Sequence, residues 1–273
     1  MSGEPPPPDP APAEGDTAVA LAGGRVLVAG DRLPTIGEAG AATALRRLAL
    51  GRHDDVPVWA LELGPGAAPE GLAAVGLRDL HDVVGERLWA LAGRGVQLLA
   101  WDRDHRFCGR CATPTARVAG EHARRCPVCG LAAYPRLSPA VIVLVERGDE
   151  ILLARSTRPG AAFHSTLAGF VEPGETLEQA VRREVMEEVA VELAEVRYFG
   201  SQPWPFPNSL MIGFRAAWAS GEPRPDLTEI AEAGWFRADA LPPVPPRLSI
   251  ARSLIEDFRR RQGRAAPRDP RIA

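Results

Sequence analysis

The stretch that decides the fold is GFVEPGETLEQAVRREVMEEVAV, residues 169–191. Thr176 followed by Gln179 has the pattern of a capping box, which predicts that a helix begins at this point. An apolar stripe at helical spacing then gives this helix one buried face. Its members are Leu177, Ala180, Val181, Val185 and Val189. The glycine-containing loop before Thr176 is therefore a turn that leads into the helix N-terminus.

The predicted helix also carries a cluster of acidic residues. Glu184, Glu187 and Glu188 stand at i, i+3 and i+4, so their carboxylates share one face. Glu188 falls inside the apolar stripe on a helical wheel, whereas a solvated charge run would lie opposite it. Carboxylates at the edge of a core repel one another and are costly to desolvate, so they require cations. Clustered hard oxygens suit Mg²⁺ or Mn²⁺. We also expect Arg183 to pair with one of the acids, Glu175.

Four cysteines form a second cluster. Cys108 and Cys111 make one C-x2-C turn, Cys126 and Cys129 make another, and fourteen residues separate the two turns. This spacing predicts a tetrahedral zinc site on a short ribbon. Because four thiolates leave no open position for water, we favour a structural zinc over a catalytic or nucleic-acid-binding one.

The ribbon is rich in arginine. Seven arginines against three acidic residues between positions 102 and 136 leave a surplus of four positive charges. The arginines are Arg103, Arg106, Arg110, Arg117, Arg124, Arg125 and Arg136, and the acids are Asp102, Asp104 and Glu121. Such a patch suits a polyanion, although solvated arginine faces are common.

The bulk composition excludes several classes. The net charge of the 273 residues is only −3, so no global field recruits nucleic acid or membrane. There is no apolar run of about eighteen residues, and the N-terminus lacks the pattern of a signal peptide. We therefore predict a cytoplasmic protein without a membrane partner.

The chain divides into five segments by composition. We predict a disordered proline-rich tail (1–15), a small α+β domain (16–101), the zinc ribbon (102–134), a catalytic domain (135–262) and a C-terminal tail (263–273). The α+β domain should end in a helix over 79–101 that buries one face, namely Leu80, Val83, Val84, Leu88, Leu91 and Ala92. Residues 138–155 read as a hairpin around Gly148, and residues 249–261 as a final helix.

Residues 169–191 resemble the Nudix box, G-x5-E-x7-R-E-U-x-E-E-x-G-U with U aliphatic. The matching residues are Gly169, Glu175, Arg183, Glu184, Val185, Glu187, Glu188 and Val191. Ala190 replaces the last glycine of the box, and since a positive φ costs alanine about 1 kcal/mol, we expect a reshaped helix exit. The resemblance implies the α/β/α sandwich of Nudix hydrolases with a mixed sheet, within a chain of α+β class.

The resemblance also implies a chemistry. Nudix hydrolases cleave a nucleoside diphosphate linked to another moiety, using roughly two or three divalent ions that neutralise the pyrophosphate and lower the pKa of a bound water. Carried onto this chain, the metal contacts fall on Glu184, Glu188, Glu229 and the carbonyl of Ala168. The catalytic base is Glu188 or Glu187, and the residues alone leave this choice open.

Three features narrow the substrate. The chain resembles the NADH pyrophosphatase, or NudC-type NAD-capped RNA hydrolase, family in three respects. These are the order of small domain, four-cysteine ribbon and Nudix box, the loop SQPWPFPNS (201–209) and the stretch AGRGVQL (92–98). That family implies a homodimer that acts on NAD(H) and NAD-capped RNA. The implied substrate contacts are Arg78, Glu121, Tyr134, Gln202, Pro203, Trp204, Pro205, Phe206, Pro207, Asn208, Ser209 and Ala251.

The proline-aromatic loop makes physical sense as a base-binding surface. Three prolines fix φ and should keep Trp204 and Phe206 out of regular structure, so that an aromatic surface is held ready for stacking. The alternative is a plug over a core edge. The sequence thus predicts hydrolysis of NAD(H) to NMN(H) and AMP and removal of NAD caps from RNA. The alternatives are a hydrolase of ADP-ribose or another dinucleotide, and a zinc-ribbon regulator that senses a nucleotide without catalysis.

Overall fold

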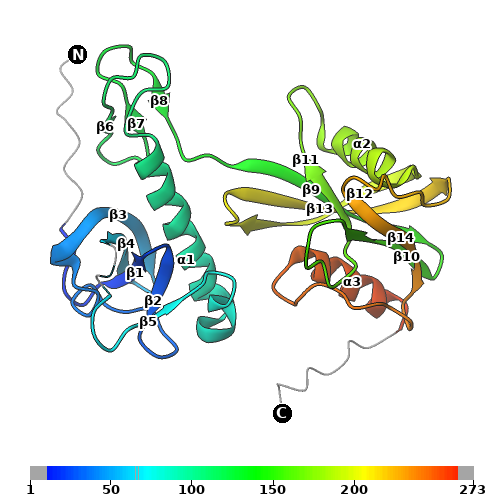
Figure 1. Cartoon of the computed structure of the whole chain (residues 1–273), viewed down its shortest axis with the longest axis horizontal. Helices are drawn as coiled ribbons and strands as arrows, with labels where there is room; N and C mark the ends of the chain where they lie inside the picture. Colours follow the sequence, from blue (N-terminus) through cyan, green and yellow to red (C-terminus); the bar gives the residue numbers. More distant parts are fainter. Residues whose placement is uncertain (1–10, 65, 67, 264–273) are drawn as a thin grey trace. The chain divides into compact units, whose positions relative to one another are not determined.

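The computed structural model describes residues 11–64, 66 and 68–263, and it separates into two units (Figure 1). Unit 1 contains residues 1–136 together with 205–208, and unit 2 contains residues 137–204 and 209–273. The predicted disordered tail lies mostly outside the described residues. Its last part is ordered, because Ala13 N–H donates to the carboxylate of Asp16 at 2.9 Å and Glu14 accepts from Gly37 N–H at 3.0 Å.

Unit 1 begins with a five-stranded sheet in the order β3-β4-β1-β2-β5, in which β1 and β4 are parallel. Its elements are β1 (Thr17–Ala22), β2 (Arg25–Val28), a 3-10 turn η1 (Ala41–Thr43), β3 (Ala44–His53), β4 (Val56–Leu63) and β5 (Ala73–Val75). Leu27, Trp59 and Leu61 belong to the apolar cluster on one face of this sheet. Helix α1 (Leu80–Asp104) packs against β1, β3 and β4.

The buried face of α1 differs from the predicted one. Leu80 and Ala92 are buried as expected, but Val83 is exposed, and Trp89, Leu98, Leu99 and Trp101 are buried outside the predicted set. Gly85 has φ 77° and ψ 173°, which is not helical. The chain kinks there, so the spacing of three and four residues does not carry from Leu80 to the second part of the helix.

The zinc ribbon follows α1 as a three-stranded sheet in the order β6-β7-β8. The strands are short: β6 is Ala116–Arg117, β7 is Arg124–Arg125 and β8 is Ala132–Ala133. Both neighbouring pairs are antiparallel. Strands of this length cannot build a core of their own, so the ribbon depends on the cysteine turns and on contacts with α1.

Unit 2 contains a six-stranded mixed sheet. Five strands lie in the order β12-β13-β9-β10-β14, and β11 pairs with β9. The strands are β9 (Ser138–Arg147), β10 (Glu150–Ser156), β11 (Leu167–Phe170), β12 (Glu192–Trp204), β13 (Ser209–Ser220) and β14 (Ile230–Arg237). The pair β13–β9 is parallel and the others are antiparallel. The predicted hairpin around Gly148 is therefore confirmed as β9–β10.

Two helices cover the two faces of this sheet. On β9, Val141, Val143 and Val145 face the cluster that contains α2 (Leu177–Val189), whereas Ile142 and Leu144 face the cluster that contains α3 (Ile250–Arg261). Alternation along one strand thus fills two cores. Figure 1 shows the resulting layers of helix, sheet and helix. The predicted α+β class with a Nudix-type sandwich, a four-cysteine ribbon and a small N-terminal domain is confirmed.

The proline-aromatic loop is a hairpin rather than an irregular segment. Strand β12 runs to Trp204, which pairs with Ser209 of β13, so the expectation that Trp204 lies outside regular structure was wrong. Pro203 is compatible with the strand because β12 is at the sheet edge, where an N–H on the outer side makes no ladder bond. Only residues 205–208 form the turn.

Candidate functional site

Helix α2 begins as the sequence predicts. Thr176 Oγ1 accepts from Gln179 N–H at 3.2 Å, and Gln179 Oε1 accepts from Thr176 N–H at 2.8 Å. This reciprocal capping box satisfies two backbone donors and fixes the direction in which the helix starts. All residues of the predicted stripe except the half-exposed Leu177 are buried. The acidic residues of the helix therefore have defined positions relative to the sheet.

Arg183 connects three carboxylates and one strand. Its guanidinium donates to both oxygens of Glu175 at 2.5 and 3.0 Å, to Glu184 at 2.9 Å, and to Glu187 at 3.0 Å. It also donates to the carbonyl of Phe170 on β11 at 2.9 Å. The expected pairing with Glu175 is present, and Arg183 lowers the pKa of that carboxyl to about 2. Because a guanidinium is planar and always charged, it orients these groups without titrating itself.

Glu184 lies directly over a glycine of β11. A Cβ atom at Gly169 would stand 1.8 Å from Cδ of Glu184, so any side chain there would collide with the carboxylate. Gly169 therefore provides the space in which Glu184 sits, next to Ala168. Burial is the main cause that raises the pKa of Glu184, and Arg183 opposes it.

Glu188 is the most unusual group of the helix. It is only 7% exposed, and its Oε2 atom has no hydrogen-bond partner among the described residues. Burial, followed by the charges of Glu184, Glu229 and Asp226, raises its pKa to about 8. A hydrogen bond from the backbone of Ala168 offsets this rise only in part. A buried carboxylate among like charges is costly, and a hard cation is the group that removes this cost. The donor set thus fits a divalent metal ion.

A loop before β14 holds the remaining acidic residues. Asp226 N–H donates to the carbonyl of Glu188 at 3.1 Å, and the Asp226 carboxylate accepts from Glu229 N–H at 3.1 Å and from Ile230 N–H at 2.8 Å. Asp226 thereby ties the end of α2 to the turn that carries Glu229. Sequence reasoning missed Asp226; its only signal was an acid three residues before Glu229, the spacing of an Asx turn.

The four cysteines converge as predicted. Within residues 11–64, 66 and 68–263 they are the only group of three or more metal-binding side chains whose ligand atoms all lie within 4.8 Å of one another. The Sγ atoms of Cys108 and Cys129, and those of Cys111 and Cys126, are 3.5 Å apart. Tetrahedral zinc with Zn–S bonds of about 2.3 Å implies S···S separations of about 3.8 Å, so the geometry fits.

The two cysteine turns share one backbone pattern. In the first, Arg110 N–H donates to Cys108 Sγ at 3.4 Å, and in the second Cys129 N–H donates to Cys126 Sγ at 3.4 Å. Each turn ends in a residue with positive φ, Ala112 or Gly130. The backbone N–H of Cys129 lowers the pKa of the Cys126 thiol, which favours the thiolate form that binds zinc.

The hairpin tip carries its aromatic residue against α1, within unit 1. The rings of Phe206 and Trp89 have centroids 6.4 Å apart, and the guanidinium carbon of Arg78 lies 4.0 Å over the Phe206 ring. Pro205 is buried against Gly93, where a Cβ would lie 2.7 Å from Pro205 Cγ. The predicted contacts Arg78 and Phe206 are therefore brought together, and Gly93 of the stretch 92–98 packs against the tip.

Other predicted substrate contacts lie elsewhere. In unit 2, the side-chain amide of Gln202 donates to Leu248 O at 2.7 Å and accepts from Ile250 N–H at 2.8 Å, so it caps the start of α3. Ala251 is buried in the core beneath that helix. In unit 1, Glu121 and Tyr134 are exposed on the ribbon, and Asn208 donates to Arg136 O at 3.3 Å. Pro203 and Pro207 are exposed, Trp204 is half-buried and Ser209 is buried.

Family models cover most of the chain. A NUDIX domain model matches residues 136–258, an NADH pyrophosphatase zinc ribbon domain matches 103–134, and an NADH pyrophosphatase-like rudimentary NUDIX domain matches 15–101. The NAD-capped RNA hydrolase NudC of Stutzerimonas stutzeri is 51% identical over 219 residues, covering 80% of this chain and 79% of that protein. The chain belongs to the NudC family of Nudix hydrolases. Proteins with the same name from Deinococcus radiodurans (50% identical, 77% of this chain and 76% of that protein) and Pseudomonas fluorescens (46%, 87% and 83%) are also similar.

As a Nudix hydrolase, the chain departs from the box at Ala190 without the expected change in the helix exit. Ala190 adopts φ 57° and ψ 37°, the left-handed conformation of a helix-ending glycine, and its N–H donates to Met186 O at 3.0 Å. A Cβ at Gly221 would lie 2.8 Å from Ala190 O, so the neighbouring chain packs tightly on this exit. The surrounding structure imposes the turn, and Ala190 carries the strain.

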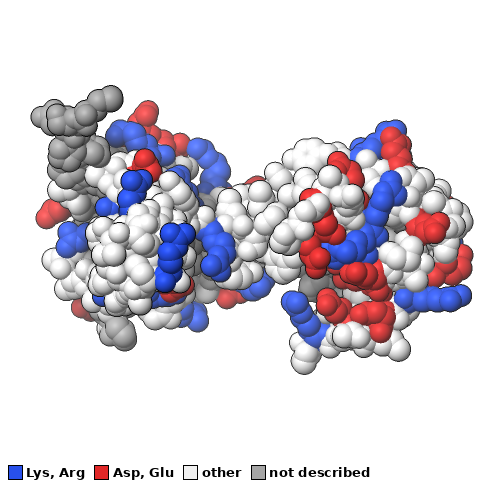
Figure 2. Space-filling view, turned by 90° about the horizontal axis from the view of Figure 1, so that it is seen from above, with Lys and Arg blue, Asp and Glu red and all other residues white. Residues whose placement is uncertain are grey.

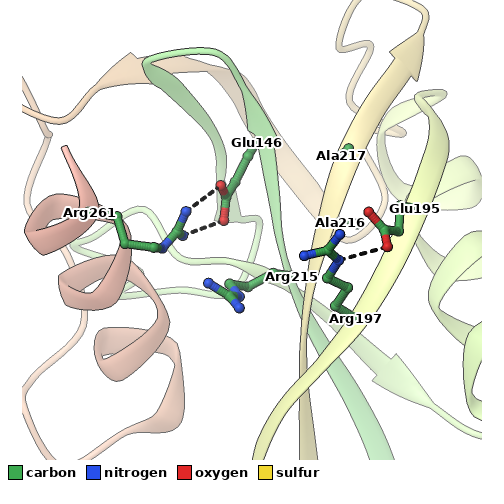
Figure 3. A pocket seen from close by; sticks show the side chains of 7 residues that line it. All are labelled: Glu146, Glu195, Arg197, Arg215, Ala216, Ala217 and Arg261. Carbon is green, nitrogen blue, oxygen red and sulfur yellow. Dashed lines mark hydrogen bonds and ion pairs between the residues drawn. The ribbon is translucent and has the colours of Figure 1, made fainter.

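One open cavity of the Nudix domain is unsuited to a pyrophosphate. It encloses about 270 Å³, and its lining includes Arg197, Arg215 and Arg261 (Figure 3). Each of these pairs with a carboxylate, respectively Glu195, Asp257 and Glu146. The charges therefore cancel. Figure 2 shows the same intermingling of acidic and basic side chains over the visible face of the Nudix domain. No helix in the described part of the chain is long and apolar enough to cross a membrane.

Gly169→Ala should displace Glu184 and weaken divalent-metal binding. The alanine Cβ meets Glu184 Cδ, while the strand backbone accepts alanine. We expect Mn²⁺ affinity, measured by electron paramagnetic resonance, to fall about tenfold with little change in thermal unfolding. Gly200→Ala, where a Cβ meets nothing within 4 Å, is the control. Unchanged Mn²⁺ affinity in Gly169→Ala would contradict the role of Gly169 in leaving space for the Glu184 carboxylate.

Ala190→Gly should stabilise the Nudix domain. Glycine adopts the left-handed conformation without the strain that alanine carries, and part of the gain is lost to the freedom of glycine in the unfolded chain. We expect the free energy of unfolding in urea to rise by about 0.5 to 1 kcal/mol. The same change at Ala90, exposed inside α1, should lower it by about 1 kcal/mol. A decrease in the free energy of unfolding in both variants would show that Ala190 does not carry this strain.

Glu188→Gln should change how stability depends on pH when Mg²⁺ and Mn²⁺ are absent. Folding raises the pKa of Glu188 from 4.5 to about 8, so the wild type loses stability as pH rises through this window. Glutamine removes that loss. At pH 8 the zinc-loaded variant should be more stable than the wild type by on the order of 2 kcal/mol, and near pH 4.5 the difference should shrink. A difference in unfolding free energy between Glu188→Gln and the wild type that is the same at every pH would contradict the raised pKa of Glu188.

Proposed function

We propose that this Nudix hydrolase cleaves the pyrophosphate bond of NAD(H) to give NMN(H) and AMP, and that it also removes NAD caps from RNA 5′ ends. The single observation that carries the proposal is the buried carboxylate of Glu188, whose Oε2 atom has no hydrogen-bond partner among the described residues and which is surrounded by the charges of Glu184, Glu229 and Asp226. The names of the relatives, NAD-capped RNA hydrolases, support the choice of substrate.

Glu184, Glu188, Glu229 and the carbonyl of Ala168 would hold the divalent ions, Mg²⁺ or Mn²⁺. When bound, these ions neutralise the pyrophosphate oxygens and lower the pKa of a water molecule. Oxygen donors at the edge of a buried site suit these hard cations better than zinc. Gly169 keeps the space over β11 open for Glu184, and Asp226 holds the peptide of Glu229 in place.

The remaining groups of α2 orient the acidic residues and accept a proton. Arg183 holds Glu175, Glu184 and Glu187 with one guanidinium, which fixes the orientation of the acidic face. The base that takes the proton of the attacking water is Glu188, whose raised pKa suits the task near neutral pH, or Glu187, which is exposed. The water then attacks one phosphorus, and the bond from that phosphorus to the bridging oxygen breaks.

The hairpin 201–209 would recognise the dinucleotide. Bases stack on aromatic side chains for about 1 to 3 kcal/mol each. Phe206 contacts Arg78 and Trp89, and both aromatic residues of the hairpin, Trp204 and Phe206, remain candidates for stacking. Arg78, Glu121, Tyr134, Gln202 and Ala251 remain proposed contacts from the family pattern. For Gln202 and Ala251, their hydrogen bonds and burial favour a role in holding α3.

Three further features belong to the proposal. The four-cysteine site holds one structural zinc, since four thiolates close the tetrahedron. The active form is a homodimer, as expected from the family resemblance. The protein acts in the cytoplasm, where the cysteines remain reduced and free to bind zinc.

The test compares kcat/KM on NADH, NAD⁺, ADP-ribose and NAD-capped RNA. NADH and capped RNA should be the best substrates, and Glu188→Gln should lower kcat on both by at least about a hundredfold. Glu178→Gln, which removes an exposed acid from the same helix, is the control and should retain activity. Trp204→Ala should raise KM for NADH about tenfold. A preference for ADP-ribose supports the alternative hydrolase, and no turnover in the wild type supports the nucleotide-sensing alternative.

A further inference from the structure

Glu229 brings its carboxylate to the acidic face of α2 from a separate turn. Its side chain is exposed and makes no hydrogen bond or ion pair within the part of the chain that the structure describes. After burial, the charge of Glu229 is one of the causes that raise the pKa of Glu184 and Glu188, so its carboxylate lies close to both. A flexible glutamate reaches a defined place only if its backbone is fixed. The groups that fix this backbone therefore decide where the carboxylate lies.

Asp226 holds the N–H groups on both sides of the Glu229 Cα atom. Both of its carboxylate oxygens accept from Glu229 N–H at 3.1 Å, and Oδ1 also accepts from Ile230 N–H at 2.8 Å. Ile230 is buried in the core beneath α2, so the turn is anchored directly after Glu229. Leu227, inside the turn, is 71% exposed and has a φ of 62°, which leucine rarely adopts. Such strain persists only where surrounding contacts impose it, and the hydrogen bonds of Asp226 span this residue.

Thr157 holds the carbonyl groups of the same two peptides. It follows directly after β10, in the central sheet of the Nudix domain. Its N–H donates to Glu229 O at 2.8 Å, and its hydroxyl donates to Thr228 O at 2.8 Å and lies 3.3 Å from Glu229 O. All four polar groups of the two peptides that flank Glu229 Cα are thus satisfied by Asp226 and Thr157. The turn is fixed from the loop on one side and from the sheet on the other.

The loop that carries Asp226 is itself joined to the end of α2. The last carbonyls of a helix have no partner inside it, and this loop supplies two donors. Arg224 N–H donates to Val189 O at 2.9 Å, and Asp226 N–H donates to Glu188 O at 3.1 Å. Asp226 therefore connects the backbones of Glu188 and Glu229 directly, through its N–H to the first and its carboxylate to the second. Glu188 is the residue whose buried Oε2 atom lacks a partner among the described residues.

We propose that Asp226 and Thr157 are positioning residues that hold the Glu229 carboxylate near that of Glu188, so that a divalent ion can engage both. This inference rests on the proposed function and deepens it. Asp226 acts through the turn and is not itself a metal ligand, because both of its carboxylate oxygens are engaged by backbone N–H groups. A turn that is already formed loses less freedom when the ion binds. Loss of either residue should therefore weaken metal binding before it affects the chemical step.

The first test compares Asp226→Ala with Asp226→Asn. The asparagine Oδ1 still accepts from the N–H groups of Glu229 and Ile230, although the negative charge is lost. We expect Asp226→Ala to weaken Mn²⁺ binding, measured by electron paramagnetic resonance, about tenfold, and Asp226→Asn to stay within about threefold of the wild type. Glu222→Gln removes an exposed acid from the same loop and should bind Mn²⁺ like the wild type. Equal losses in the alanine and asparagine variants would make Asp226 a metal ligand and overturn the proposal.

The second test compares Thr157→Val with Thr157→Ser. Valine keeps the shape and the backbone donor but removes the hydroxyl, and serine keeps the hydroxyl. Valine should weaken Mn²⁺ binding about fivefold, and serine should leave it within about twofold. Because both residues hold one turn, Asp226→Ala combined with Thr157→Val should lose less than the product of the two single losses. Losses that multiply would show that the residues act separately. If Asp226→Ala does not fold, the valine and serine pair decides the role of the turn.

Amide hydrogen exchange tests the turn without any catalytic metal. In the zinc-loaded protein, with Mg²⁺ and Mn²⁺ absent, the segment containing Glu229 and Ile230 should exchange at least about tenfold faster in Asp226→Ala than in the wild type. The amides in the middle of α2 should exchange as in the wild type. Equal exchange of the turn in both proteins would refute the positioning role.

Activity on NADH separates this inference from the proposed function. Asp226→Ala should need about tenfold more Mg²⁺ for its half-maximal rate, and its kcat should return to within about threefold of the wild type when Mg²⁺ saturates. A loss of kcat that excess Mg²⁺ does not restore would contradict positioning. If the wild type hydrolyses neither NADH nor NAD-capped RNA, the proposed function fails, whereas Mn²⁺ affinity and amide exchange still decide the roles of Asp226 and Thr157.

Discussion

The burial of the Glu188 carboxylate is the constraint on which the site depends. The apolar stripe of α2 turns this residue toward the sheet, and Glu184, Glu229 and Asp226 add negative charge around it. A folded protein tolerates such a group only protonated or beside a cation. Three features keep this group in place: the capping box, the Arg183 network and the strained exit at Ala190. They cost stability or use polar contacts that a purely structural helix would not require.

The chemistry of α2 was predictable because it is local. The positions of Thr176, Gln179 and the glutamates within one helix follow from 3.6 residues per turn, and the cysteine turns follow from the spacing of zinc ligands. Asp226 was not predictable, since its role arises from hydrogen bonds to the end of α2, 38 residues away in the chain (226 − 188). The buried face of α1 was predicted only in part, because the helical spacing does not carry across the non-helical backbone of Gly85.

The hairpin shows how a correct motif can be given the wrong local structure. Three prolines in nine residues suggest an irregular loop, yet an edge strand has no ladder bond to lose on its outer side. The sheet therefore extends to Trp204, and the tip packs through Pro205 and Phe206 onto Gly93, Trp89 and Arg78. The contacts of Phe206 with Trp89 and Arg78 thus have features of the plug alternative.

Asp102 shows why the structure is needed to distinguish the ion-paired arginines of the ribbon from the others. The sequence shows seven arginines, but a buried acid at the end of α1 withdraws two of them to fasten the ribbon to the N-terminal domain. Burial acts to raise the pKa of Asp102, but the hydrogen bonds and charges of Arg117 and Arg124 outweigh it and lower the pKa, which favours the ionised carboxylate. Arg124 shares one face of the small sheet with Arg117, and Arg125 lies on the opposite face. The antiparallel register therefore separates the paired arginine of β7 from its exposed neighbour, which the sequence alone does not distinguish.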